Sequence, residues 1–178
     1  LSFNPHPREF FSTFREPFNI ITPTFKKDLF EKLGLDIYIN FDFDENLASL
    51  SPDEFIQRIL VEKLSIKNII LGADFKFGKD RKGDLLLIKE KAQEYQFNVT
   101  VIKPVIEANS KQKYSSSIIR KHIKNGMFEK VTEALGRYWH MSGKVILGDQ
   151  RGKKNGFPTA NFEPDHHILP LKGVYCVY

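Results

Sequence analysis

The sequence predicts an α/β protein in which an open parallel sheet is followed by the start of a small β domain. Strand patterns alternate with helix patterns along most of the chain, which is typical of parallel strands joined by right-handed crossovers. No helical period follows Leu135. Turns rich in glycine and proline separate the remaining segments, as in small β domains.

Capping residues mark the helices of the first part. Thr22 precedes Pro23, which suits an N-cap residue followed by proline at the first helical position, and Gly34 ends this helix. The sequence SPDE at 51–54 predicts a capping box that opens a second helix. A third helix is expected over 85–96.

Strand patterns lie between these helices. DIYINF (36–41) alternates apolar residues, KNIILG (67–72) is continuously apolar, and NVTVIK (98–103) alternates again. Ligands of open α/β sheets bind beyond the carboxyl ends of the strands. The stretches NPHP (4–7) and ADFKFGKDRKGD (73–84) therefore become candidate site loops.

The last part of the chain has a different pattern. Two short helices are expected over 116–125 and 127–135, and a strand series begins with SGKVILG at 142–148. We therefore predict one domain over residues 1–136 and the start of a second over 137–178.

The composition indicates the cellular compartment and the class of partner. The chain has 178 residues, 41% of them apolar, and a net charge of +5, which suits nucleic acids or anionic small molecules such as nucleotides. The single cysteine, Cys176, argues against a disulfide framework and for a reducing compartment. No apolar run reaches membrane-spanning length. We expect a cytoplasmic protein without a membrane partner, and both ends read as cuts within strands of a longer protein.

The sequence YSSSIIRKHIKNG (114–126) is a candidate phosphate site. Ser116 stands where the helix is expected to begin, and helix N-termini bind anions through free N–H groups. Arg120 lies one turn on, on the face of Ser116 and Ser117, so hydroxyls, amides and a guanidinium converge. The alternative is an ordinary serine cap with a surface arginine.

Two further stretches carry candidate ligand-binding residues. NPHP holds Asn4 and His6 in a turn stiffened by prolines, although His6 bonded only to backbone is the alternative. GDQRGKKNGFPTANF (148–162) contains Thr159 and Asn161, whose oxygens lie two residues apart and suit Mg²⁺ beside a nucleotide phosphate. The alternative for this pair is the capping of a β-turn.

The remaining signals favour structural roles. The five histidines lack metal-ligand spacing, and the adjacent pair His166 and His167 reads as exposed. KDRK (79–82) is expected to be a solvated loop surface, and Trp139 a packing residue between the two domains.

Taken in order, the motifs resemble those of the bifunctional bacterial riboflavin kinase/FMN adenylyltransferases, the prokaryotic FAD synthetases. SFNPHP (2–7) is similar to the strand-end motif of that family, and residues 43–84 to its central segment. SSSIIR (115–120) resembles its phosphate-binding signature. Residues 135–162, with the sequence PTAN and its preceding glycines, resemble the entry to its kinase module.

The resemblance implies a nucleotidyltransferase Rossmann-like sheet followed by a riboflavin-kinase β-barrel. It implies two Mg²⁺-dependent reactions, phosphorylation of riboflavin by ATP to FMN and adenylylation of FMN by ATP to FAD. The implied adenylyltransferase residues are Asn4, His6, Asp74, Ser116, Ser117 and Arg120. The implied kinase residues are Gly148, Gly156, Thr159 and Asn161, the last two as metal ligands. Phe75 or Phe77 supplies an aromatic wall, and the sequence leaves open which.

The chain departs from the family pattern in three ways. The HxGH-type motif of the family is expected before Leu1, and the general-base glutamate of its kinase beyond Tyr178. Ser117 stands where the family often has threonine, and the hydroxyl is retained. No catalytic residue is therefore expected within the chain, and the chain alone is expected to catalyse neither reaction.

Three other interpretations stay open. Pantetheine-phosphate and nicotinamide-nucleotide adenylyltransferases share the first fold but lack a β module with the PTAN motif. A non-catalytic nucleic-acid-binding protein would fit the positive charge, but no basic stripe alternates with stacking aromatics, so we expect no nucleic-acid partner. A paralogue that kept the fold and lost catalysis is the third.

Overall fold

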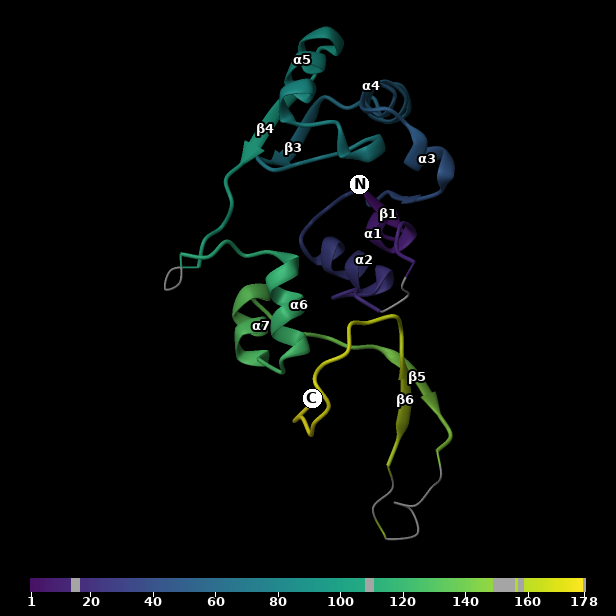
Figure 1. The fold of residues 1–178 in the computed structure, drawn as a ribbon, viewed down its shortest axis with the longest axis vertical. Coiled ribbons are helices and arrows are strands. Elements are labelled where there is room, and N and C mark those ends of the chain that lie inside the picture. Colours follow the sequence, from purple (N-terminus) through teal and green to yellow (C-terminus); the bar gives the residue numbers. More distant parts are fainter. Residues whose placement is uncertain (14–16, 108–110, 149–155, 157–158, 178) are drawn as a thin grey trace. The chain divides into compact units, whose positions relative to one another are not determined.

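A computed structural model of the chain describes residues 1–13, 17–107, 111–148, 156 and 159–177. These residues form two compact units. The N-terminal unit comprises 1–13 and 39–113, and the C-terminal unit comprises the described residues of 14–38 and 114–178. Figure 1 shows the elements in chain order.

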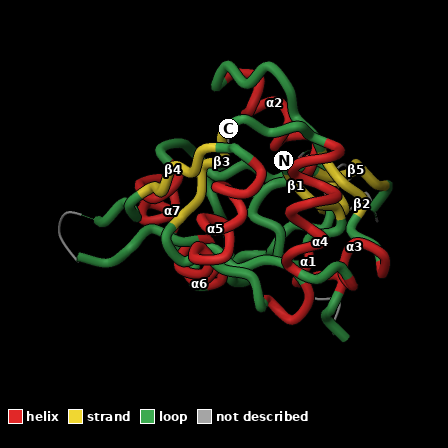
Figure 2. The backbone as a smooth tube through the Cα atoms, turned by 90° about the horizontal axis from the view of Figure 1, so that it is seen from above, coloured by secondary structure: helices red, strands yellow, loops and turns green. Residues whose placement is uncertain are grey.

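Parallel strand pairs in the N-terminal unit confirm the mixed α/β class. Strand β1 (Ser2–Asn4) pairs with β2 (Asn40–Asp42), and β3 (Asn68–Gly72) pairs with β4 (Asn98–Ile102). The second pair runs side by side in Figures 1 and 2. Within the described residues the strands form separate two-stranded sheets rather than one open sheet.

One strand is shorter than its sequence pattern predicts. The alternation over 36–41 predicted a strand, yet β2 begins only at Asn40, so the expectation is wrong for 36–39. Ile39 still accepts the N–H of Ser2 through its carbonyl oxygen, at 2.8 Å. Ile37 is 74% exposed, so no core contact reinforces the alternating pattern there.

Helical segments connect the strands of this unit. They are α1 (Pro7–Phe10), α3 (Glu45–Ser49), α4 (Pro52–Glu54), a π-helix over Phe55–Lys63, a 3₁₀ turn over Lys79–Arg81 and α5 (Leu85–Tyr95). The 79–82 surface is exposed, as the sequence predicted.

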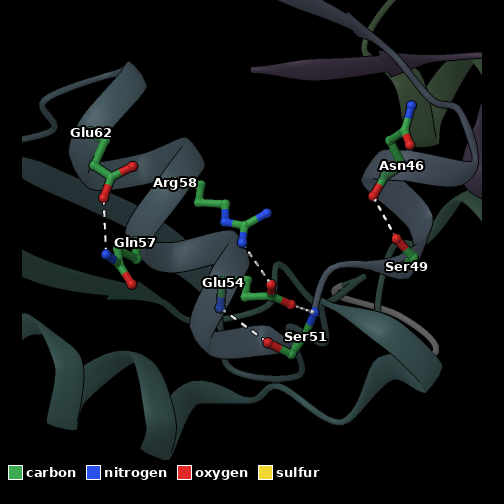
Figure 3. A network of polar contacts seen from close by, with 7 residues as sticks. All are labelled: Asn46, Ser49, Ser51, Glu54, Gln57, Arg58 and Glu62. Carbon is green, nitrogen blue, oxygen red and sulfur yellow. Dashed lines mark hydrogen bonds and ion pairs between the residues drawn. The ribbon is translucent and has the colours of Figure 1, made fainter.

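The capping box at 51–54 forms as the sequence predicted. The Glu54 amide donates to Ser51 Oγ at 3.2 Å, and the Ser51 amide donates to Glu54 Oε2 at 3.0 Å (Figure 3). Arg58 adds an ion pair to Glu54 Oε1 at 3.0 Å. These hydrogen bonds, led by the one from the Ser51 backbone, hold the pKa of Glu54 below its ordinary value. Two free N–H groups at the helix start are thereby satisfied.

The core of the N-terminal unit lies between the π-helix, α5 and strand β3. Its fully buried side chains are Ile56 and Ile88. Around them lie Phe55, Leu60, Leu71, Phe77, Ala92 and Phe97. The i→i+5 bonding of the π-helix widens each turn, so Ile56 takes a core place while Ile59 is only half-buried.

The C-terminal unit combines three helices with a hairpin. They are α2 (Pro23–Lys32), α6 (Ser116–Lys124), α7 (Phe128–Leu135) and the antiparallel pair β5 (Gly143–Ile146) and β6 (Asn161–Pro164). The Phe25 amide donates to Thr22 Oγ1 at 3.3 Å, which confirms the predicted N-cap. Gly34 and Gly136 adopt positive φ, as expected where helices end.

A short segment, residues 18–22, links the parts of the C-terminal unit. The carbonyl oxygen of Ile20 accepts Trp139 Nε1–H at 2.8 Å, and that of Asn19 accepts the Ile168 amide at 3.0 Å. Trp139 also stacks on Phe128, so its predicted packing role is confirmed within this unit. Since α6, α7 and the hairpin share one unit, the boundary at 136/137 stays a prediction.

The expectation that both adjacent histidines are exposed is wrong for His167. His166 is exposed and adopts a left-handed backbone with φ of 43°. This turn directs the next side chain inward, and His167 is completely buried. Its neighbour Ile168 joins the core formed by Ile119, Ile123 and Val131.

Candidate functional site

The loops that follow β3 and β4 meet at one ion pair. Because the two strands are parallel and in register, with Gly72 opposite Ile102, their carboxyl ends lie at the same edge. Asp74 follows β3 by two residues, and Lys113 closes the segment after β4. Lys113 Nζ lies 2.5 Å from Asp74 Oδ2. The sequence singled out Asp74 but missed Lys113, since a lone lysine carries no local signal of a distant partner.

This ion pair is open to solvent and charged. The side chains of Asp74 and Lys113 are 74% and 45% exposed. The hydrogen bond from Lys113, and secondly the backbone of Asp74 itself, hold the pKa of Asp74 below its ordinary value. Asp74 is therefore a carboxylate at neutral pH that accepts hydrogen bonds only.

The rest of the 72–83 loop is fixed to the core, which settles the position of its aromatic residues. Phe77 is buried, and Phe75 stacks on it half-buried, with ring centroids 5.5 Å apart. The amide and carbonyl of Phe77 both bond to Gly83, at 3.2 and 2.9 Å.

Two glycines of this loop have packing roles. A Cβ at Gly83 would lie 2.7 Å from the Phe77 ring, and one at Gly78 would lie 2.8 Å from the backbone of Pro52. The core therefore explains these two glycines without a ligand.

The NPHP turn lies at the end of β1. Asn4 is the last residue of this strand, and both Asn4 and His6 are exposed. His6 Nδ1 accepts the amide of Arg8 at 3.0 Å and caps the short helix α1. The backbone contact offered as the alternative for His6 is thus present, and its ligand role stays a prediction.

Helix α6 begins at Ser116, as the sequence predicted. Ser115 is its N-cap, and Ser115 Oγ accepts the Ile118 amide at 3.3 Å. Ser116 and Ser117 form the exposed first turn. Their hydroxyls therefore lie at the helix end where anions are favoured.

Arg120 is tied to the chain that precedes α2. Its Nε donates to the carbonyl oxygen of Phe18 at 2.8 Å, and its guanidinium lies 4.7 Å from the centroid of the Phe18 ring. Arg120 is half-buried rather than a free surface arginine. Phe18 therefore fixes the orientation of the guanidinium plane.

The predicted kinase residues cluster on the β5–β6 hairpin. Asn161 opens β6 opposite Ile146, and a Cβ at Gly148 would overlap the Asn161 side-chain amide. Thr159 and Asn161 are both exposed, and Thr159 precedes the strand. Gly156 has φ of 81° within a turn. The basic stretch 149–155 and residues 157–158 lie outside the described residues.

A pocket of about 410 Å³ lies in the C-terminal unit, beside the start of α2. Its lining includes Thr24, Asp28, His140, Ser142 and Asp165, and it contains none of the ten predicted site residues. In the described part of the chain, no group of three or more His, Cys, Asp or Glu residues is arranged to hold a metal. Within the same ranges, no helix has the length and apolar character to cross a membrane.

Curated relatives match the sequence over nearly the whole chain. Proteins named bifunctional riboflavin kinase/FMN adenylyltransferase are 39% identical in Buchnera aphidicola from Schizaphis graminum, 33% in Escherichia coli K12 and 35% in Bacillus subtilis 168. The matches cover 98, 98 and 99% of this chain and 56, 55 and 55% of those proteins. The chain thus spans about half the length of the curated relatives it matches.

A solved structure and two family models complete the comparison. A Streptococcus pneumoniae crystal structure titled a macrolide-efflux protein superimposes with a TM-score of 0.80 at 28% identity, over 97% of this chain and 56% of the other. The riboflavin kinase model matches residues 135–178. The FAD synthetase model matches residues 1–118, about two thirds of the 178 residues, and the chain therefore belongs to the FAD synthetase family.

Proposed function

We propose that the full-length protein makes FAD in two steps. In the first, a ribityl hydroxyl of riboflavin takes the γ-phosphoryl group of ATP, giving FMN and ADP. In the second, the FMN phosphate attacks the α-phosphorus of another ATP, giving FAD and pyrophosphate. One observation carries the proposal: FAD synthetase and riboflavin kinase models match the same chain, in that order, at 1–118 and 135–178.

The ion pair of Asp74 and Lys113 supports the second step. Two anions, FMN and ATP, must approach each other, and a cationic group near the reacting phosphates offsets their repulsion. Lys113 supplies such a charge at the edge of the sheet where α/β proteins bind ligands. Asp74, an acceptor only, suits hydroxyl or amino groups of the substrates rather than phosphate.

The first turn of α6 is a further proposed contact for phosphate. The hydroxyls of Ser116 and Ser117 and the positive end of α6 suit the leaving pyrophosphate. Arg120, one turn on, would strengthen this site through its guanidinium. Asn4 and His6 are proposed to contact the nucleotide from the end of β1.

The hairpin residues support the kinase step. Asn161 and Thr159 offer exposed neutral oxygens, which match the hard-oxygen ligands that Mg²⁺ takes beside nucleotide phosphates. Mg²⁺ supplies charge neutralisation on the transferring phosphoryl group when it is bound. Gly148 leaves room for the Asn161 amide, because any side chain at that position would overlap it. Gly156 is proposed to let the backbone approach the nucleotide through its turn.

The proposal also includes the domain division, the partners and the cellular compartment. The domain division at 136/137, with a Rossmann-like first domain and a barrel as the second, fits the order of the family matches. The proposed partners are the small molecules ATP, riboflavin and FMN. Soluble substrates and the lone exposed Cys176 suit the cytoplasm as the compartment.

The test uses the full-length protein with ATP and Mg²⁺, supplied with riboflavin or with FMN in separate reactions. Chromatography of the flavins should show FMN and FAD from riboflavin, and FAD with pyrophosphate from FMN. A protein that forms neither product from either substrate would contradict the proposal.

A further inference from the structure

His167 is a completely buried imidazole that holds the start of the β5–β6 hairpin. Its Nε2 accepts the backbone N–H of Ser142 at 3.1 Å, and Ser142 immediately precedes β5. The carbonyl oxygen of Ser142 accepts the amide of Asp165 at 2.9 Å. Ser142 is thus held at two points by the segment that follows β6.

The contact with Ser142 fixes the protonation state of the ring. A nitrogen that accepts a backbone N–H must carry a lone pair, so Nε2 is unprotonated and the neutral ring bears its proton on Nδ1. Nδ1 is buried and has no well-formed hydrogen bond within the described structure. An imidazolium would place an Nε2–H against the Ser142 N–H, two donors facing each other. It would still be able to donate to Ser142 Oγ, 3.3 Å away, but the backbone contact would be lost.

The cluster has the residue types of a hydrolase triad but not its arrangement. In a triad the imidazole stands between the serine and the carboxylate. Here the Ser142 hydroxyl stands between them, 3.1 Å from Asp165 Oδ2 and 3.3 Å from His167 Nε2. The hydroxyl proton directed at Asp165 does not reach the imidazole. The arrangement therefore suits a structural contact rather than an activated nucleophile.

The surroundings of His167 act on its pKa in opposite directions. Burial lowers the pKa of His167 below its ordinary 6.5, and the nearby His140 lowers it further. Asp165 and the backbone of Ile20 act in the opposite direction and only partly offset the burial. The 18–22 segment packed beside it, FNIIT, contributes no titratable side chain.

We propose that the contact between His167 and Ser142 is a proton-sensitive latch, closed while the imidazole is neutral and opened when it is protonated. Because the neutral ring is favoured in the folded chain, the latch stays closed above pH 6.5 and weakens as the pH falls. Opening removes one of the two backbone contacts that hold Ser142 at the base of β5, the strand that leads to Gly148 and pairs with Asn161 of β6. It also changes the pocket beside α2, whose lining includes Ser142, Asp165 and His140.

Trp139 provides a built-in reporter for the latch. It is the single tryptophan of the chain, and its ring meets that of His167 edge-on at 6.3 Å between centroids. The experiment follows Trp139 emission of the full chain between pH 8 and pH 5. We expect one transition with a midpoint below 6.5 in the natural sequence.

Two substitutions separate the latch from general effects of acid. His167→Gln keeps an oxygen that can accept the Ser142 N–H and removes the titration, so its emission should stay flat. His166→Gln, at the adjacent exposed histidine, should keep the transition unchanged. A transition that persists in His167→Gln, or that vanishes in His166→Gln, overturns the proposal.

Nuclear magnetic resonance gives a second test that needs no folded variant. In the natural sequence the His167 ring should titrate below 6.5, and the Ser142 amide should shift with the same midpoint. A ring that titrates at or above 6.5, or a Ser142 amide that stays in place while the ring titrates, contradicts the latch.

Discussion

Lys113 Nζ and Asp74 Oδ2 lie 2.5 Å apart although 39 residues separate them in the chain. The contact joins the loops after two neighbouring parallel strands, at the edge where their carboxyl ends meet. Both side chains are largely exposed, and exposed ion pairs add little to stability. The ion pair therefore contributes little to folding, and its role in nucleotide binding is the proposal that the following variants test.

Replacing Lys113 by Met should therefore lower FAD formation from FMN without changing the melting temperature. Loss of a charge-assisted contact to phosphate predicts a decrease on the order of ten- to a hundredfold. The matched control is Lys111→Met, an exposed lysine of the same segment, which should behave as the natural protein. A Lys113→Met protein with full adenylyltransferase activity would remove Lys113 from the site.

Arg120→Ala should impair FAD formation tens- to hundreds-fold, a loss on the order of 2–4 kcal/mol, while FMN formation stays nearly unchanged. The Phe18 contacts predict an additional decrease in the stability of the C-terminal unit. Melting curves measured beside both activities separate the two effects, and Lys121→Ala on the same helix is the control. Equal loss of both activities would assign Arg120 a purely structural role.

Gly83→Ala should destabilise the chain by about 1–3 kcal/mol, the usual cost of an overpacked core. The new methyl group would lie 2.7 Å from the buried Phe77 ring. Gly72→Ala is the control in the same loop, because its methyl group meets only the movable Asp74 carboxylate, at 3.2 Å. Urea unfolding of the natural, Gly83→Ala and Gly72→Ala proteins measures their free energies of unfolding. If the Gly83→Ala protein is as stable as the natural one, the loop accommodates the methyl group and the prediction is wrong.

Asp84, the N-cap of α5, should make the stability of the chain depend on pH in acid. Its Oδ1 accepts the amides of Leu86 and Leu87, at 3.0 and 3.2 Å. The Leu87 bond first, and then Lys76, lower the pKa of Asp84. The folded state thus binds its proton less readily than the unfolded state, whose pKa is near the ordinary 3.8. The stabilisation is fully present above pH 3.8 and is lost as the pH falls through the lower folded value.

Unfolding of the natural and Asp84→Asn proteins at pH 7 and pH 3 measures this effect. Asparagine keeps a cap but carries no charge, so the natural protein should be the more stable one at pH 7, and the difference should shrink at pH 3. Glu90→Gln, at an exposed position of α5, is the control. A difference that stays constant with pH would mean that the charge of Asp84 is unimportant for the cap.

Local motifs were predictable because their physics is local. The Thr22 cap, the 51–54 capping box and the left-handed Gly34 each depend on a few consecutive residues, and all three form as expected. The prediction of a strand over 36–39 was wrong because alternation alone does not bury a side chain, and Ile37 is exposed. Helix α6 begins at Ser116 as predicted, with Ser115 as its N-cap.

Contacts between residues far apart in the chain could not be predicted from the sequence. Nothing near His167 indicates that a turn at His166 would bury it, and nothing near Lys113 points to Asp74. The choice between Phe75 and Phe77 likewise depended on Gly83 closing the loop over Phe77. The ligand roles of the ten predicted site residues stay predictions, since they depend on substrates as well as on the chain.

The central claim, two separate phosphate-transfer sites on one protein, is tested most directly by assaying Asn161→Ala and Lys113→Met in the full-length protein. Each variant receives riboflavin or FMN separately with ATP and Mg²⁺, and Glu163→Gln on β6 is the hairpin control. Asn161→Ala should abolish riboflavin phosphorylation and still make FAD from FMN, because water would replace a fixed oxygen ligand only in the kinase site. Lys113→Met should show the reverse. If Asn161→Ala keeps its kinase activity, or if each variant loses both activities equally, the two-site account is contradicted.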